Sequence, residues 1–256
     1  MPDAKAFRAE SSDGIVLVTI DRPDRRNALS RDAWLELRGL LRRLGDDPAT
    51  EGMIITGAGD RAFASGADVA ELADRDPMVA LDGLVQGILL DLEALPFPTI
   101  AALNGYALGG GWELALACDL RVASSSAQVG FPEVGLGIMP GAGGTLRLLR
   151  HVGVGRAKEW IMTGRILAAH EAESFGLVNR VVAPDDLLDA ARTLMVELVS
   201  QPRLAVRLAK MVIDAAARGQ AGPELERMAY TLTFHAPDRS ERMHRFLEQR
   251  AARQKD

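Results

Sequence analysis

The sequence predicts an α/β fold with a helical C-terminal part. Short runs rich in Val, Ile and Leu end in Gly, Asn or Asp and alternate with amphipathic stretches up to about residue 186. Beyond that residue the pattern is helical almost throughout, and strand-like runs no longer occur. Such alternation is typical of α/β proteins, whose strands pair in parallel or in a mixed arrangement.

Five of the short runs are predicted to be strands, because each combines β-branched residues with a turn residue. They are GIVLVTIDR (14–22), GMIITGAG (52–59), FPTIAALNG (97–105), CDLRVASS (118–125) and GLVNRVVA (176–183). Two amphipathic segments, SRDAWLELRGLLRRL (30–44) and VALDGLVQGILLDLEAL (79–95), are predicted to be helices. Ser30 is a plausible N-cap, since its hydroxyl can accept a hydrogen bond from a first-turn amide.

The C-terminal part is predicted to be a helical subdomain. Its segments are DLLDAARTLMVELVS (186–200), RLAVRLAKMVIDAAARG (203–219) and ERMHRFLEQRAARQ (241–254). We place the boundary near residue 195, which gives a core at 1–195 and a helical subdomain at 196–256. Single amphipathic helices are marginal in water, so these helices are expected to pack on the core or on another subunit.

Composition and charge exclude several classes of protein. Hydrophobic residues make up 48% of the 256-residue chain and charged residues 25%, as in ordinary globular proteins. The net charge of -5 argues against a general nucleic-acid-binding protein, which needs clustered Lys and Arg. The N-terminus lacks an apolar leader, and no apolar run approaches a membrane span of about 18 residues. We therefore expect a cytoplasmic protein that binds neither nucleic acid nor membrane.

The cysteine and histidine content argues against a disulfide, a zinc hydrolase and a serine hydrolase. Cys118 is the only cysteine, and its apolar surroundings favour a buried structural thiol over a nucleophile. The four histidines, His151, His170, His235 and His244, form no HExxH pair, and none flanks a GxSxG serine.

The first chemically informative stretch is RAFASGADVAEL (61–72). Its small residues, from Ala64 to Ala67, let a ligand approach the backbone closely. Gly66 can adopt a conformation that presents the next amide outward. The alternative interpretation of this stretch alone is an ordinary turn before a helix.

The second stretch is FPTIAALNGYALGGGWELALACDL (97–120), in which a strand runs into three glycines and a helix that carries Glu113. Amides at a helix N-terminus are unpaired and favour an oxygen that gains negative charge. A phosphate site is the rival interpretation. Neither the lysine of a GxxxxGK[ST] motif nor a GxGxxG spacing is present here, so an oxyanion site fits at least as well.

The third stretch is VGFPEVGLGIMPGAGGTLRLLRHVG (129–153). Glu133 follows Pro132, which fixes the local path of the backbone. An acidic residue in such a loop could be simply solvated. The glycines do not form a dinucleotide-binding loop, because Pro140 stands where that fingerprint requires its third glycine.

Taken together and in this order, the three stretches resemble the signature regions of the enoyl-CoA hydratase/isomerase (crotonase) family. The resemblance is carried by AFASGAD, NGYALGGGWELALACD and FPEVGLGIMPGAGGTLRL. DRPDRRNALS (21–30) is similar to the family's N-terminal element, and the similarity extends from about residue 13 to residue 182. It implies a spiral of repeated ββα units followed by a C-terminal helical subdomain.

Carried over position by position, the resemblance places an oxyanion hole at the backbone amides of Ala67 and Gly110. It places two catalytic carboxylates at Glu113 and Glu133, and the presence of both is the hydratase pattern. Glu133 is assigned as the proton donor to the α-carbon, and Glu113 as the residue that orients and activates water. Paired amides aimed at the thioester oxygen suit this reaction, since loss of one such donor costs about 2.7–4 kcal/mol in other enzymes.

The resemblance also implies contacts with the coenzyme A thioester, mainly from the arginine-rich N-terminal loop and the AFASGAD segment. The expected contact residues are Arg25, Arg26, Ala28, Ala64, Gly66, Asp68, Val69, Gly109, Trp112, Pro132, Gly141 and Phe246. Two family lysines are replaced here by Ala70 and Gln249, and Arg25, Arg26 or Arg250 could compensate for their charge. Trp112 could shorten the acyl pocket or pack in the core.

The implied activity is the hydration of a 2-enoyl-CoA to a 3-hydroxyacyl-CoA in fatty acid metabolism. No metal or redox cofactor is implied, because coenzyme A is part of the substrate. The C-terminal helices imply a homotrimer or a homohexamer. Two alternatives remain: a 3,2-enoyl-CoA isomerase, in which one acid is dispensable, and an acyl-CoA-binding protein without catalysis.

Overall fold

The computed structural model describes residues 5–67, 72–73 and 76–253. The chain divides into two compact units, Met1–Ser200 and Gln201–Asp256. The division follows helix α8 (Leu187–Val199), whereas the sequence pattern had suggested residue 195. Position 195 is unsuitable as a boundary because the side chain of Met195 is fully buried in the first unit.

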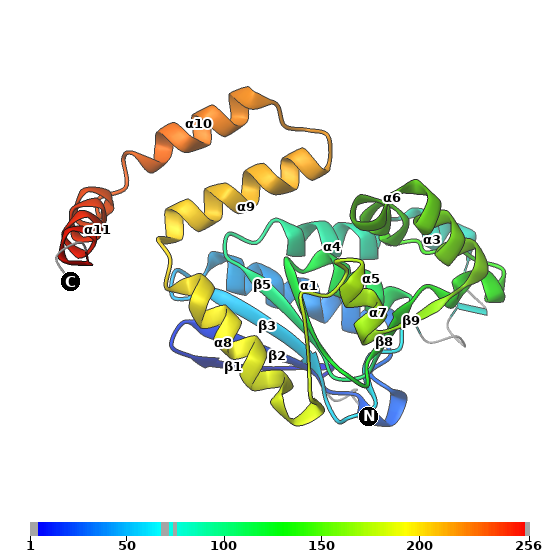
Figure 1. Ribbon diagram of the computed structural model, residues 1–256. Coiled ribbons are helices and arrows are strands. Elements are labelled where there is room, and N and C mark those ends of the chain that lie inside the picture. Colours follow the sequence, from blue (N-terminus) through cyan, green and yellow to red (C-terminus); the bar gives the residue numbers. More distant parts are fainter. Residues whose placement is uncertain (1–4, 68–71, 74–75, 254–256) are drawn as a thin grey trace. The chain divides into compact units, whose positions relative to one another are not determined.

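The first unit contains a six-stranded sheet in which all pairs of neighbouring strands but one are parallel (Figure 1). Only the pairing of the first two strands is antiparallel, with Phe7 opposite Ile20. The strand order is β1 (Phe7–Ser12), β2 (Ile15–Ile20), β3 (Gly52–Gly57), β5 (Thr99–Leu103), β7 (Leu120–Ser124) and β10 (Arg180–Val182).

A second sheet consists of four short strands. Its order is β4 (Ala62–Ala64), β6 (Tyr106–Leu108), β8 (Gln128–Gly130) and β9 (Ile166–Ala168). Each of the pairs β3 and β4, β5 and β6, and β7 and β8 contributes one strand to each sheet before the chain returns through helices. Equivalent strands of successive pairs are parallel neighbours. The predicted α/β spiral of ββα units is confirmed.

Helices connect the strands of this spiral. They are α1 (Arg31–Asp46), α3 (Pro77–Leu81), α4 (Leu84–Glu93), α5 (Gly110–Ala117), α6 (Gly144–Thr163) and α7 (Ala169–Ser174). Ser30 caps α1 as predicted, since its Oγ accepts a hydrogen bond from the Ala33 amide at 3.3 Å. The single helix expected at 79–95 is wrong: Gly83 adopts φ 62° and separates α3 from α4.

The central strands of the larger sheet are buried on both faces. Met53 and Ile55 of β3 point into the main core, which also contains Trp34 of α1. Ile54 points the other way, toward Met195 on α8. Successive side chains of a strand alternate between faces, so a fully buried strand such as β3 is covered on both sides. Figure 1 shows α8 lying across one face of this sheet.

The second unit consists of α9 (Arg203–Ala217), α10 (Pro223–Thr233) and α11 (Arg239–Arg253). Helices α9 and α10 pack against each other. Many of its apolar side chains are exposed, namely Leu204, Met211, Ile213, Met228, Tyr230, Leu232, Phe234, Met243, Phe246 and Leu247. Among the described residues of the whole chain, no helix is both long and apolar enough to cross a membrane.

Candidate active site

The backbone amides of Ala67 and Gly110 lie close together where the second sheet meets α5. Gly66 has φ 94°, a conformation that favours glycine and turns the chain after β4. A methyl group built on Gly110 would lie 4.0 Å from the Ala67 nitrogen, and one built on Gly66 would lie 3.5 Å from the Gly110 nitrogen. Gly110 is the first residue of α5, so its amide has no partner within the helix. Two neighbouring amides of this kind can stabilise an oxygen that gains negative charge.

Gly111 holds α5 against β4 and so keeps these two amides close. A methyl group on Gly111 would lie 2.1 Å from the carbonyl oxygen of Ala64 and 2.8 Å from its Cβ. Real side chains do not approach backbone atoms this closely, so only glycine fits without movement of the strand. The preceding Gly109 has φ 52° and ψ -124°, which turns the chain into the helix.

Two asparagines, the buried Asn27 and the partly buried Asn104, anchor the start of β4. Asn27 donates from Nδ2 to the carbonyl oxygens of Ala62 at 2.7 Å and Ala58 at 3.0 Å, and its Oδ1 accepts from the Arg22 amide. Asn104 donates to the same Ala62 oxygen at 3.2 Å. These bonds satisfy backbone groups that the short strand cannot pair by itself. They fix the path of the chain that leads to Ala67.

Glu113 lies on the buried side of α5, where its side chain is held by backbone amides. The residue is 3% exposed. Its Oε1 accepts hydrogen bonds from the amides of Ala142 at 2.7 Å and Gly144 at 2.8 Å. Gly144 begins α6, so the carboxylate also faces the positive end of a helix dipole. Both bonds use Oε1, which leaves Oε2 for another partner.

Glu133 lies in a 3-10 helix, η2 (Pro132–Leu136), a different segment from the one that carries Glu113. A methyl group on Gly109 would lie 3.0 Å from Glu133 Oε1, so this carboxyl group is next to the start of α5. Its Oε2 is buried and forms no hydrogen bond with the described part of the chain. The two glutamates therefore approach the paired amides from two different segments.

The environments of the two acids separate their protonation states. Burial, with a contribution from the charge of Glu113, raises the pKa of Glu133 to about 7. Burial also raises the pKa of Glu113, but the amides of Gly144 and Ala142 and the charge of Arg147 act in the opposite direction. The two amides and Arg147 stabilise the ionised form of Glu113. None of these three groups donates a hydrogen bond to Glu133 Oε2. The hydrogen bonds and the positive charge beside Glu113 favour its ionised form, whereas burial favours the protonated form of Glu133.

Replacement of Glu133 by Gln is expected to stabilise the protein at alkaline pH. The pKa of Glu133 rises from 4.5 in the unfolded chain to about 7 in the folded protein. The folded state thus keeps a proton, and the associated stability is present below pH 4.5 and lost as the pH rises through 7. Allowing for partial solvation of this carboxyl group, Glu133→Gln should raise the free energy of unfolding by about 1–3 kcal/mol at alkaline pH.

Urea denaturation at a series of pH values measures this effect. The difference between Glu133→Gln and the unmodified protein should shrink as the pH falls toward the unfolded-state pKa. A difference that is independent of pH would show that the buried carboxylate is not its source.

The structure places part of the predicted substrate-binding set beside these amides. Arg25 and Arg26 lie at the end of the 3-10 helix η1 (Pro23–Arg25). The loop that follows runs along the AFASGAD segment: the Ser65 amide donates to the Arg26 carbonyl oxygen at 3.1 Å, and the Leu29 amide donates to that of Gly66 at 2.9 Å.

The other predicted contact residues have different environments. Ala28 and Ala64 are buried, and Pro132 begins η2. Gly141 is exposed in the loop before α6. Phe246 is 64% exposed and belongs to the second unit, as does Gln249. Asp68, Val69 and Ala70 lie outside the described residues.

Trp112 is a core residue in this structure. It is 1% exposed and belongs to the main core together with Phe97 and Leu114. Of the two interpretations of Trp112 from the sequence, packing in the core is the one that the structure supports. Cys118 is likewise buried, and its Sγ lies 3.6 Å from the Leu114 carbonyl oxygen, as expected of a structural thiol.

Several residues that bind or stabilise Glu113 could not be predicted individually from the sequence. Ala142, Gly144 and Arg147 all fall within PGAGGTLRL, which contributed to the family resemblance. Their role depends on a contact with Glu113 that is distant in the chain. Asn104, which anchors β4, was likewise not singled out.

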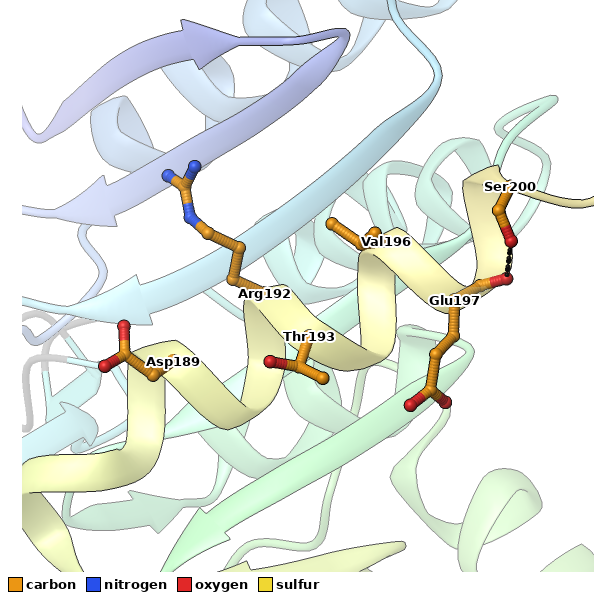
Figure 2. Close-up of a pocket in the computed structure, with 6 residues that line it drawn as sticks. All are labelled: Asp189, Arg192, Thr193, Val196, Glu197 and Ser200. Carbon is orange, nitrogen blue, oxygen red and sulfur yellow. Dashed lines mark hydrogen bonds between the residues drawn. The ribbon is translucent and has the colours of Figure 1, made fainter.

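A groove of about 690 Å³ on α8 contains none of the predicted site residues. It is lined by Asp189, Arg192, Thr193, Val196, Glu197 and Ser200, which Figure 2 shows along one side of the helix. The Ser200 hydroxyl donates to the Glu197 carbonyl oxygen at 2.8 Å, and Glu197 also pairs with Arg180. The described residues contain no cluster of three His, Cys, Asp or Glu side chains suited to a metal ion.

Comparisons with known proteins identify the family of this chain. The chain is 42% identical over 247 residues to a crotonyl-CoA hydratase from Syntrophomonas wolfei subsp. wolfei, with 95% of each chain covered. It is 41% identical over 248 residues to a short-chain-enoyl-CoA hydratase from Clostridium acetobutylicum, with 94% of each covered. The crystal structure of an enoyl-CoA hydratase from Bacillus anthracis superposes with a TM-score of 0.90 at 39% identity, covering 95% of this chain and 96% of that one. The sequence profile of the enoyl-CoA hydratase/isomerase family matches residues 10–256, and the chain therefore belongs to that family.

Proposed function

We propose that this protein is an enoyl-CoA hydratase that adds water, with syn geometry, across the 2,3 double bond of a 2-enoyl-CoA thioester. The observation that carries the proposal is that a buried glutamate, Glu113, and a partly buried one, Glu133, lie beside two neighbouring backbone amides. Relatives that are 41–42% identical are named as hydratases of crotonyl-CoA and of short-chain enoyl-CoA, and these names support the same activity.

In the proposed mechanism, the thioester carbonyl oxygen accepts hydrogen bonds from the amides of Ala67 and Gly110. The free oxygen of the Glu113 carboxylate accepts a proton from water as the water oxygen bonds to C3. The π electrons move toward C2 and the carbonyl oxygen, and the two amides stabilise the charge that develops there. The protonated carboxyl group of Glu133 then delivers a proton to C2.

One turnover leaves the proton on Glu113 and the negative charge on Glu133. Exchange with solvent after product release, or transfer between the two acids, restores the starting state. Water has then contributed its oxygen to C3, and the overall proton balance is zero. Neither a metal nor a redox cofactor takes part in this proposal.

For coenzyme A recognition, we propose that the loop around Arg25 and Arg26 binds the carrier's phosphates. Backbone hydrogen bonds join this loop to the segment that leads to Ala67, and this supports a position of the two arginines near the paired amides. Replacement of both arginines by Gln should raise KM more than it lowers kcat, because they contact only the unreacting part of the substrate.

The proposed hydratase activity is tested by the purified protein's conversion of 2-enoyl-CoA esters of increasing chain length. Loss of the conjugated-thioester absorbance should be fastest with short acyl chains such as but-2-enoyl-CoA. Conversion of 3-enoyl-CoA without hydration would instead indicate an isomerase. Binding of acyl-CoA by calorimetry, with no turnover of any ester, would indicate a protein that binds acyl-CoA without catalysis.

We further propose that the protein assembles as a homotrimer or as a homohexamer. The second unit exposes many large apolar side chains, and surfaces of this kind are usually covered by a partner. Light scattering should give three or six times the chain mass of 27.5 kDa. A monomer mass at micromolar concentration would contradict this proposal.

A further inference from the structure

A buried ion pair joins α4 to α6 next to the loop that holds Glu113. Arg147 Nε lies 2.8 Å from Glu93 Oε1, and the two side chains are only 5% and 12% exposed. Burying two charges is costly unless their remaining hydrogen-bonding groups are also satisfied. The other partners of this pair therefore indicate what it does in the fold.

The second partner of Arg147 is the backbone of the loop before α6. Its Nη1 donates to the Ala142 carbonyl oxygen at 2.7 Å. The loop curls around the guanidinium group so closely that a methyl group on Gly143, which has φ 95°, would lie 2.6 Å from Nη1. The planar fork of Arg can bind a carboxylate and a carbonyl at once, which a lysine ammonium does less well.

The same loop supplies both hydrogen bonds to Glu113. The amides of Ala142 and Gly144 donate to Glu113 Oε1, and the Ala142 carbonyl oxygen accepts from Arg147. A shift of Arg147 would therefore rotate the groups that orient the carboxylate. Arg150 also approaches Glu93, with its Nη1 4.0 Å from Glu93 Oε1, and places a second guanidinium group beside this carboxylate.

We infer that the Glu93–Arg147 ion pair is a positioning device for Glu113, and that it holds the 142–144 loop so that one carboxylate oxygen is fixed and the other is free for the reacting water. The inference rests on the proposed hydratase function, but it makes a separate claim about residues that do not touch the substrate. Arg147 and Glu93 are positioning residues in this account, and Glu113 is the catalytic residue.

Kinetics of Arg147→Met and Glu93→Gln provide the first test. We expect kcat of hydration to fall by about 10- to 100-fold in Arg147→Met and less in Glu93→Gln, with KM changed by less than about threefold. Arg147→Lys should recover only part of kcat. The matched control is Arg38→Met, because Arg38 joins α1 to Asp91 of α4 at 3.1 Å without contacting the loop. Equal kcat losses in the Arg38 and Arg147 variants would overturn the inference.

A second readout does not depend on activity. Carbon-13 NMR of glutamate carboxyl groups, with the Glu113 signal assigned by its loss in Glu113→Gln, follows the titration of this residue directly. Arg147→Met should move its titration to higher pH, whereas Arg38→Met should not. If the unmodified protein hydrates no enoyl-CoA, the proposed function fails while this readout still tests the positioning role. If Arg147→Met does not fold, Glu93→Gln serves in both measurements, and an unchanged titration there overturns the inference.

Discussion

Glu113→Gln and Glu133→Gln should each lower kcat for hydration by about 100- to 10,000-fold, the range that loss of a general acid or base produces. Glutamine keeps the size of the side chain, and its amide oxygen can still accept hydrogen bonds. In Glu113→Gln, Oε1 can keep its bonds to the Ala142 and Gly144 amides, but the other position can no longer accept a proton from water. In Glu133→Gln, the carboxyl proton is lost.

The double variant should lose little more than the slower single variant, since the two acids act in one proton-transfer sequence. Steady-state kinetics with but-2-enoyl-CoA, together with circular dichroism to confirm folding, measures the effect. A double variant that retains a substantial part of the activity would contradict the mechanism. Isomerase activity that survives Glu113→Ala would favour an isomerase, in which a single acid moves the proton between carbons.

Gly111→Ala should lower kcat/KM by about 100-fold or more, as does the loss of one oxyanion-hole donor in other enzymes. The added methyl group meets the Ala64 carbonyl oxygen at 2.1 Å, so β4 and α5 must separate. Ala67 follows β4 and Gly110 begins α5, and separation of the two elements moves the paired amides apart. The free energy of unfolding should also fall by about 1–3 kcal/mol, as in other overpacked cores.

Gly87→Ala is the matched control for this prediction. A methyl group on Gly87, in the middle of α4, meets nothing within 4 Å. This substitution should leave kcat/KM unchanged and raise the free energy of unfolding by up to about 1 kcal/mol, because Ala is the better helix former. A Gly111→Ala protein with normal kcat/KM would show that contact between β4 and α5 does not set the spacing of the amides.

The sequence predicted the long elements of the fold better than the short ones. Strands such as β3 are six residues long and rich in β-branched and other apolar residues, so their pattern is recognisable in the sequence. The strands of the second sheet are only three residues long and show no usable alternation. Strand β1 was missed for another reason: apart from Phe7 its residues are exposed, and its polar sequence resembles a loop.

The sequence likewise predicted some residues of the candidate site and not others. Glu113 and Glu133 were predicted because each lies in a motif, and the family resemblance gave those motifs a joint meaning. The ion pair of Glu93 with Arg147 spans 54 residues of sequence. No local sequence pattern predicts such a pair. Its contact with the loop that binds Glu113 depends on how the spiral brings α4, α5 and α6 together.

The dependence of kcat/KM on pH tests the central claim most directly, because it reports the protonation of the free enzyme's essential groups. The proposed mechanism requires Glu133 to be protonated and Glu113 to be ionised. Since the pKa of Glu133 is about 7, kcat/KM should fall about tenfold per pH unit on the alkaline side of that value. Since the pKa of Glu113 is also raised, the acid limb should lie above pH 4.5. A bell-shaped profile with these limbs is predicted, and a kcat/KM that stays level from about pH 6 to about pH 9 would contradict the assignment of the two glutamates as acid and base.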